Sequence, residues 1–325
     1  MSNLWIFLLG ALAAATLPIS NTNGVRQTNH LATAAPDPND PVEKEYQKLV
    51  DDDDAAQAEV DKWIKDNNEF AAKGAGTPPE DLKHRIKEKF APIRKRYEEF
   101  VQHHPNHARG RVAYASFLGD MNDEEAAQVQ LEKALELDTN NPAVYNNLAN
   151  IYGHDGPTKK AFEFYQRAIE LNPLESVYYH NFGTTVYLFR KDAREFYGIT
   201  EQQVFDKALD LYAKAMKLDP TNFPLASDVA QTYYGIKPTR TEDALKAWTN
   251  ALAIAHDEVE REGVYLHFAR LKLHAERFDE ARAHLKAVTN EMYFELKKRL
   301  ARNIEEQEKQ AKAGTNSPPS NSPKK

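Results

Sequence analysis

The sequence predicts an all-α protein built from stacked pairs of antiparallel helices, and three observations lead to this fold class. Alanine is abundant, only 13 of the 325 residues are glycine, and runs of β-branched residues are few. This composition favours helix over strand. Small residues recur in the middle of successive apolar helical stripes at nearly fixed intervals. The segments LELDTNNP, IELNP and MKLDP place Asn, Asp and Pro just after an apolar stripe, where helices end.

The small residues mark an internal repeat of about 34 residues. Within one pair of helices, 12 residues separate Ala149 from Ala161, and 15 residues separate Ala168 from Gly183 of the next pair. Similar intervals alternate along the chain, with a few insertions. Antiparallel helices that pack at close range need positions where one backbone can approach the next, and Gly or Ala leaves that room. We therefore interpret the small residues as packing positions and not as a ligand site.

The segment VYNNLANIYG, followed by KKAFEFYQRAIELNP, resembles a tetratricopeptide repeat, in which aromatic, small and proline residues stand at set offsets. The matching residues are Tyr145, Leu148, Ala149, Tyr152, Ala161, Tyr165, Ala168 and Pro173. Weaker units in the same register extend over residues 108–290. The resemblance implies a right-handed superhelical solenoid of about five repeats that recognises other proteins.

The remaining segments suggest how the chain is organised. We expect a signal peptide over residues 1–24, a disordered linker over 25–40 and a degenerate helix pair over 41–107. The repeat array follows over 108–289, with an insertion at 188–203. A capping helix over 290–312 would cover the apolar face of the last repeat. Residues 313–325, rich in Ser, Pro and Asn, are expected to be a disordered tail.

The N-terminal segment indicates export. Residues 4–17 form an apolar run, shorter than the roughly 20 residues that span a bilayer, and this length fits the core of a secretory signal. No Lys or Arg precedes the run, so an uncleaved membrane anchor and a cytosolic protein stay open as alternatives. We expect an exported protein of bacterial type, periplasmic or secreted.

Neither an enzyme nor a metal protein is indicated. The chain has no cysteine, and it lacks a Gly-rich phosphate loop, a GxSxG motif and an HExxH motif. In the segment HHPNH, Pro105 interrupts the helix that would align His103 and His107 on one ion. In the run Asp51–Asp54, consecutive helical side chains diverge, so a solvated charge run is expected. We expect no catalytic residue, no cofactor and no metal.

The resemblance also implies a working surface, because first helices of successive repeats line a concave groove that binds extended or helical peptides. Amides, hydroxyls and tyrosines suit this role, although some of the asparagines could instead brace neighbouring repeats. Some members of the family bind a C-terminal carboxylate with a clamp of two lysines, one arginine and two asparagines. Asn150 and Asn181 match the asparagines, but the clamp is absent, since the lysine and arginine positions hold Asn146, Pro224 and Asp228. The candidate groove residues are Asn146, Asn150, His180, Thr184, Tyr187, Ser227, Gln231, Tyr234 and Arg270.

The insertion in the third unit is a second candidate surface. The helical pattern continues past Tyr187, so both helices of this unit are expected to run on by one to two turns and to project. Aromatic and Arg residues together are typical of binding hot spots, while internal packing of the aromatic residues is the alternative. The projecting residues would be Phe189, Arg190, Lys191, Arg194, Phe196 and Tyr197.

These observations predict a non-enzymatic scaffold that binds a peptide or helix of another protein and assembles a complex in the cell envelope. The alternative is a regulatory, glycan-binding or small-molecule-binding subunit of an envelope enzyme. The net charge of −7 argues against nucleic acid as a partner. Contact with a membrane is expected only if the N-terminal segment stays uncleaved.

Overall fold

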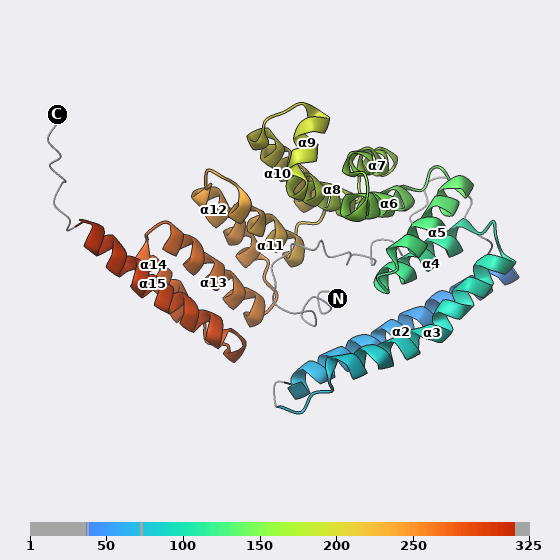
Figure 1. Ribbon diagram of the computed structural model, residues 1–325, viewed down its shortest axis with the longest axis horizontal. Coiled ribbons are helices and arrows are strands. Elements are labelled where there is room, and N and C mark those ends of the chain that lie inside the picture. The colour runs from blue at the N-terminus through green and yellow to red at the C-terminus, as the bar shows by residue number, and fades with distance from the viewer. Residues whose placement is uncertain (1–36, 38, 72–73, 316–325) are drawn as a thin grey trace, which may run out of the picture. The chain divides into compact units, whose positions relative to one another are not determined.

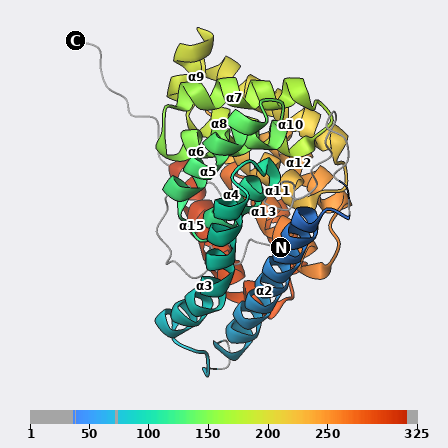
Figure 2. The ribbon, with the colours of Figure 1, turned by 90° about the vertical axis from the view of Figure 1, so that its right-hand side faces the viewer.

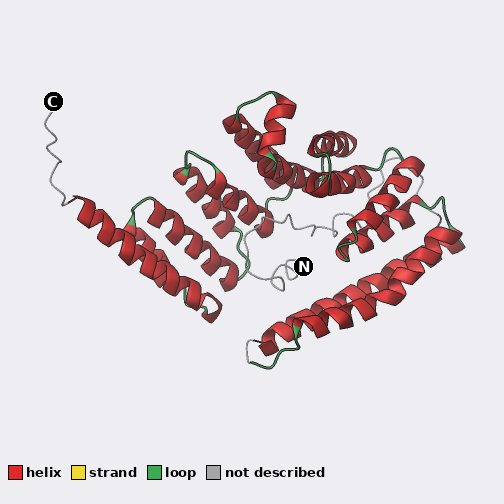
Figure 3. Ribbon diagram, viewed as in Figure 1, coloured by secondary structure: helices red, strands yellow, loops and turns green. Residues whose placement is uncertain are grey.

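The computed structural model describes residues 37, 39–71 and 74–315. These residues form fourteen α-helices and two short 3-10 helices, without a β-strand among them (Figure 3). The all-α fold of paired helices is thus confirmed. No helix in the described part of the chain has the length and apolar character to cross a bilayer. The predicted signal peptide, most of the linker and most of the tail lie outside the described residues. The chain divides into two compact units, residues 1–208 and 209–325.

Unit 1 begins with two long helices, α2 (Pro41–Ala71) and α3 (Pro79–His103), which lie side by side (Figure 1 and Figure 2). Their apolar stripes bury residues such as Ile64 and Ile86. The turn between them is fixed by Asn67, whose Oδ1 accepts a hydrogen bond of 2.6 Å from the Thr77 amide. The buried stripe and this turn hold the two helices antiparallel.

One aspartate of the acidic run is not solvated. Asp53 is fully buried, and its Oδ2 accepts a hydrogen bond of 2.8 Å from the Tyr97 hydroxyl. Gln57 donates a second hydrogen bond to Oδ1, at 2.9 Å. The expectation of a solvated run is therefore wrong for Asp53, because α3 supplies a buried donor opposite this position of α2.

The next helices of unit 1 form the repeats. They are α4 (Ala108–Asp120) with α5 (Glu124–Leu137), α6 (Pro142–Asp155) with α7 (Thr158–Leu171), and α8 (Ser176–Leu188). The small residues Ala149, Ala161 and Ala168 are completely buried. Asn141 caps α6, because its Oδ1 accepts from the amides of Ala143 and Val144. The small-residue stripe therefore lies in the packed interior, as the sequence predicts.

The insertion has a different structure from the one expected. The first helix, α8, ends at Leu188 with 13 residues and does not run on. A separate short helix, α9 (Arg190–Tyr197), follows and ends at Gly198, whose φ of 65° is the left-handed conformation that glycine favours. The second helix, α10 (Glu201–Leu218), has 18 residues against 14 in α7, so only this helix is extended. It spans the boundary between the two units.

Thr200 and Gln203 form a capping box. The Thr200 amide donates to Gln203 Oε1 at 2.9 Å, and the Gln203 amide donates to Thr200 Oγ1 at 3.4 Å. This reciprocal pair begins α10. At α5 the cap is Asp123, whose Oδ1 accepts from the Ala126 amide, and not Asn122, which has a positive φ of 57° and lies one residue before the cap.

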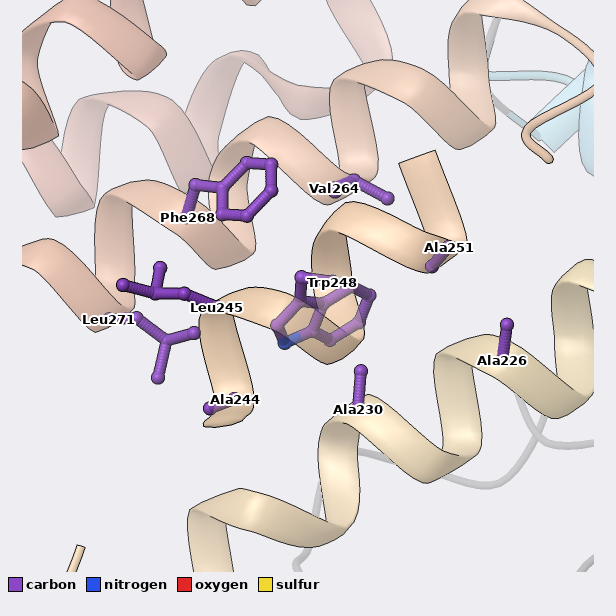
Figure 4. Close-up of a cluster of buried hydrophobic side chains, with 9 residues drawn as sticks. All are labelled: Ala226, Ala230, Ala244, Leu245, Trp248, Ala251, Val264, Phe268 and Leu271. Carbon is purple, nitrogen blue, oxygen red and sulfur yellow. The ribbon is translucent and has the colours of Figure 1, made fainter. Parts of the chain in front are cut away.

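Unit 2 contains two further pairs and a terminal helix. In the first pair, α11 (Phe223–Thr232) continues into the 3-10 turn η2 (Tyr233–Gly235) and is followed by α12 (Thr241–Ala253). The second pair consists of α13 (Glu258–His274) and α14 (Phe278–Lys286). A second 3-10 turn, η3 (Glu291–Tyr293), leads into α15 (Phe294–Thr315). Trp248 of α12 fills the core, and the methyl group of Ala230 on α11 points toward its indole (Figure 4). Leu300 and Ile304 of α15 complete a second cluster with Ala269 and Ala281.

Candidate functional site

The predicted groove residues lie on the first helices of the pairs in both units. We call the exposed side of α6 and α8 the first-helix face of unit 1, and the exposed side of α11, η2 and α13 the first-helix face of unit 2. The predicted residues of unit 1 are Asn146, Asn150, His180, Thr184 and Tyr187, and those of unit 2 are Ser227, Gln231, Tyr234 and Arg270.

Asn146 is not part of the accessible surface. Only 2% of the residue is exposed. Its Oδ1 accepts a hydrogen bond of 3.2 Å from the Asn181 amide of α8, and its own amide donates to Asn147 Oδ1 at 3.3 Å. The expectation that Asn146 is exposed is therefore wrong, because the neighbouring repeat covers it. It braces α6 against α8.

Asn150 also makes an internal contact, although it is only half-buried. Its Oδ1 accepts a hydrogen bond of 2.6 Å from the hydroxyl of Tyr165 on α7. Burial raises the pKa of Tyr165, so this hydroxyl stays protonated and remains a donor. The bond ties the two helices of one pair together and orients the Asn150 side chain.

The accessible part of the unit 1 face is formed by α8. His180, Thr184 and Tyr187 are each half-buried. The Thr184 hydroxyl donates to the His180 carbonyl at 3.0 Å, and the Tyr187 ring lies 6.1 Å from that of Phe205. These three residues follow one another at helical spacing and give the face two polar side chains beside one aromatic ring.

The unit 2 face combines amide, hydroxyl and cationic groups. Gln231 is exposed and donates to the half-buried Ser227 hydroxyl at 3.3 Å. The guanidinium carbon of Arg270 lies 4.6 Å from the ring centroid of Tyr234. This contact joins η2 to α13 and places the exposed Arg270 side chain against an aromatic surface.

The sequence did not indicate the residue that supports this arrangement, His267. Its Nδ1 lies 2.9 Å from the Tyr234 hydroxyl, and its ring stacks on the buried Trp248 indole at 3.8 Å with an interplanar angle of 11°. Burial, together with the charge of Arg270, lowers the pKa of His267 to about 4. His267 is therefore neutral at pH 7. The available signal was a histidine within the apolar pattern of a first helix, next to the packing residue Phe268.

The aromatic residues of the insertion pack inward. The rings of Phe196 and Tyr197 lie 5.4 and 5.9 Å from that of Phe162 on α7. Arg190 pairs with Glu201 at 3.1 Å, and Phe189 forms the link between α8 and α9. Arg194 and Lys191 are exposed. The structure thus shows the internal-packing alternative for Phe196 and Tyr197.

Two histidines of the segment HHPNH, His104 and His107, contact helix α2 of the N-terminal helix pair. His104 lies 3.1 Å from Glu45, and His107 lies 3.1 Å from Glu43, both on α2. His107 Nδ1 also accepts from the Gly110 amide at 2.9 Å and so caps α4. Within residues 37, 39–71 and 74–315, no three His, Cys, Asp or Glu side chains gather as a metal site.

The comparisons with known proteins support the repeat. Models of the tetratricopeptide repeat match residues 108–141 and 131–162. This confirms that residues 108–162 consist of tetratricopeptide repeats, the repeat that the sequence of this segment resembles.

Several known proteins are similar in sequence or structure to part of this chain. An uncharacterised Haemophilus influenzae protein is 35% identical over 81 residues, which cover 25% of this chain and 45% of that protein, so the chain spans about half the length of this relative. The photosystem I assembly protein Ycf3 of Synechococcus sp. is 29% identical over 130 residues, 37% of this chain and 74% of Ycf3. The solved structure of Pseudomonas aeruginosa PilF is 18% identical, with a TM-score of 0.48 over 79% of this chain and 99% of that one.

Proposed function

We propose that the chain is a non-enzymatic adaptor that binds a peptide or helical segment of another protein on its first-helix faces and assembles a complex in the cell envelope. The observation that carries the proposal is the tetratricopeptide-repeat match over residues 108–162, because proteins of this type bind other proteins or peptides. The name of the relative Ycf3 describes an assembly protein, which is consistent with an adaptor role.

The chemistry of the accessible residues supports the same function. Thr184 and Gln231 offer hydroxyl and amide groups that can both donate to and accept from a peptide backbone. Tyr187 and Tyr234 add flat apolar area with a polar tip, a composition common in protein interfaces. Asn146 and Asn150 hold α6 against its neighbouring helices through hydrogen bonds with Asn181 of α8 and Tyr165 of α7.

Site-specific photo-crosslinking tests the proposed surface. A photoreactive phenylalanine analogue is introduced at Thr184 on α8 or Gln231 on α11, and the matched controls carry it at Glu163 on α7 or Lys246 on α12. All four helices belong to the repeats, and the two control residues are exposed on second helices. We expect adducts with the same partner from Thr184 and Gln231 and none from the controls.

Two results would contradict the proposal. Equal adduct yields from all four positions would place the contact elsewhere, and the absence of adducts from Thr184 and Gln231 would remove the binding surface. The proposed export is tested separately by N-terminal sequencing of the purified protein, where an intact Met1 would contradict cleavage of a signal peptide.

A further inference from the structure

Four side chains of unit 2 form a stack that runs from the core to the surface. Trp248 is buried at its base with 1% exposure. His267 lies parallel to the indole at 3.8 Å, and the Tyr234 hydroxyl meets His267 Nδ1 at 2.9 Å. Arg270 lies over the Tyr234 ring at 4.6 Å and is exposed. Three segments, η2, α12 and α13, therefore fix the position of one surface guanidinium.

Among the residues that the structure describes, no carboxylate forms an ion pair with Arg270, whereas Arg277 and Arg282 of the same unit pair with Glu280 and Glu308. Burial lowers the pKa of His267 and of His274, the positive charge of Arg270 lowers both further, and Lys237 adds to the effect on His274. The first-helix face of unit 2 thus carries a cationic centre in a chain whose net charge is −7.

The stack reduces the entropy that Arg270 would lose on binding. A free arginine side chain loses rotamer entropy when it is fixed, and the planar guanidinium loses less when it is already held on an aromatic ring. A held guanidinium presents parallel N–H donors to an anion in a geometry that matches a carboxylate. Arg270 is therefore already oriented to form an ion pair with an anionic group of a binding partner.

We propose that Arg270 on its Tyr234–His267–Trp248 stack is an anchor for an acidic side chain of the partner protein. This inference rests on the proposed function and specifies its ligand as a peptide with an Asp or Glu at the anchoring position. A carboxylate is favoured over a phosphate because the single positive charge of one guanidinium matches the single negative charge of a carboxylate, whereas a phosphate monoester carries more negative charge. His267 is neutral at pH 7 and adds no charge of its own.

An oriented peptide library tests the proposal. Immobilised dodecapeptides of neutral composition carry one fixed central residue, which is Asp, Glu, Asn, Gln, Lys or phosphoserine, and the full-length protein is applied to them. We expect about tenfold stronger binding to the Asp and Glu sets than to the Asn and Gln sets, the gain of one charge-assisted contact. R270Q removes this preference, and R270K retains only part of it.

The matched control is R299Q, which removes the same charge from an exposed position of α15 in the same unit. The control keeps the preference for acidic peptides, and thermal melting confirms that R270Q is folded. A preference equal in R270Q and wild type, or no preference for Asp and Glu, would overturn the inference. Stronger binding of the phosphoserine set would also overturn it in favour of a phosphate ligand. Crosslinks from Thr184 without selection of acidic peptides would leave the proposed function standing and remove this inference alone.

Discussion

The Asn181 side chain of α8 donates a hydrogen bond of 3.2 Å to Asn146 Oδ1 of α6, and this bond joins two successive repeats. Asn146 is almost completely buried and Asn181 is half-buried, so the Asn146 end of the bond is shielded from water. Removing one partner of a buried hydrogen bond leaves the other unsatisfied. We expect N146A to lower the free energy of unfolding by about 1–2 kcal/mol in chemical denaturation followed by circular dichroism.

The control for this change is N250A, at an exposed position of α12. The same substitution there is expected to change stability by less than about 0.5 kcal/mol. Equal losses in the two variants would show that the Asn146–Asn181 bond does not stabilise the repeats.

The second prediction concerns His267, whose pKa is lowered to about 4 by burial and by Arg270. The unfolded chain binds a proton at this histidine near pH 6.5, and the folded chain binds it only near pH 4. The neutral histidine therefore stabilises the fold fully above pH 6.5, and this contribution is lost as the pH falls to 4. The shift of the His267 pKa from 6.5 in the unfolded chain to about 4 in the folded chain corresponds to a loss of roughly 3 kcal/mol in the free energy of unfolding over this pH range.

Nuclear magnetic resonance measures this titration directly. The His267 ring signals, assigned by their absence in H267Q, should shift with a midpoint near pH 4. A midpoint near 6.5 would contradict the buried stack. The denaturation free energy of H267Q should also depend less steeply on pH between 6.5 and 4 than that of the wild type.

The third prediction concerns Glu262 of α13, which is 4% exposed. Burial alone would raise its pKa, but hydrogen bonds from the Asn290 amide at 2.7 Å and from the Thr289 hydroxyl and amide at 2.8 and 2.9 Å outweigh burial and lower it. A carboxylate whose folded pKa is lowered stabilises the fold above its unfolded pKa. This contribution should disappear as the pH falls below the ordinary glutamate value of 4.5.

The variant E262Q tests this assignment, because glutamine has the same shape and does not titrate. We expect E262Q to be less stable than wild type at pH 7 and to approach wild-type stability in acid. The control E305Q changes an exposed glutamate of α15 and should remain close to wild type at both pH values. A constant difference between E262Q and wild type at all pH values would refute the assignment.

The fourth prediction distinguishes packing from binding in the insertion. Phe196 packs on Phe162 of α7 at 5.4 Å, whereas Arg194 of the same helix is exposed. We expect F196A to lower the free energy of unfolding by about 2 kcal/mol, less than for a fully buried phenylalanine. R194A should have an effect below about 0.5 kcal/mol. If F196A is as stable as the wild type, the contact between the Phe196 ring and Phe162 does not hold α9 against α7.

The regular part of the fold could be predicted because its cause is local and repeated. Ala149, Ala161 and Ala168 stand at intervals that only close helix packing explains, and all three are buried. The break at Phe189 could not be predicted, since the helical pattern continues through it and the contacts of α9 with α7 decide where the chain turns. Gly198, which ends the short helix in a left-handed conformation, is the local signal that the sequence offers there.

The site was predicted less well than the fold, for a physical reason. Helical spacing places Asn146 on the first helix, but its exposure depends on how closely α8 approaches. The stack of His267 on Trp248 joins two helices, so its geometry depends on tertiary packing and not on spacing within either helix. Tyr234 and Arg270 were both predicted, and only the structure shows that they touch.

The most direct test of the account is the thermal and chemical stability of A149L compared with A213L. Ala149 is completely buried on α6, whereas Ala213 is exposed on α10. We predict that A149L lowers the free energy of unfolding by about 1–3 kcal/mol, because the added side chain forces the paired helices apart. A213L is predicted to stay within about 0.5 kcal/mol of wild type. If A149L unfolds at the same denaturant concentration as A213L, small buried residues do not set the packing of these repeats, and the account is wrong.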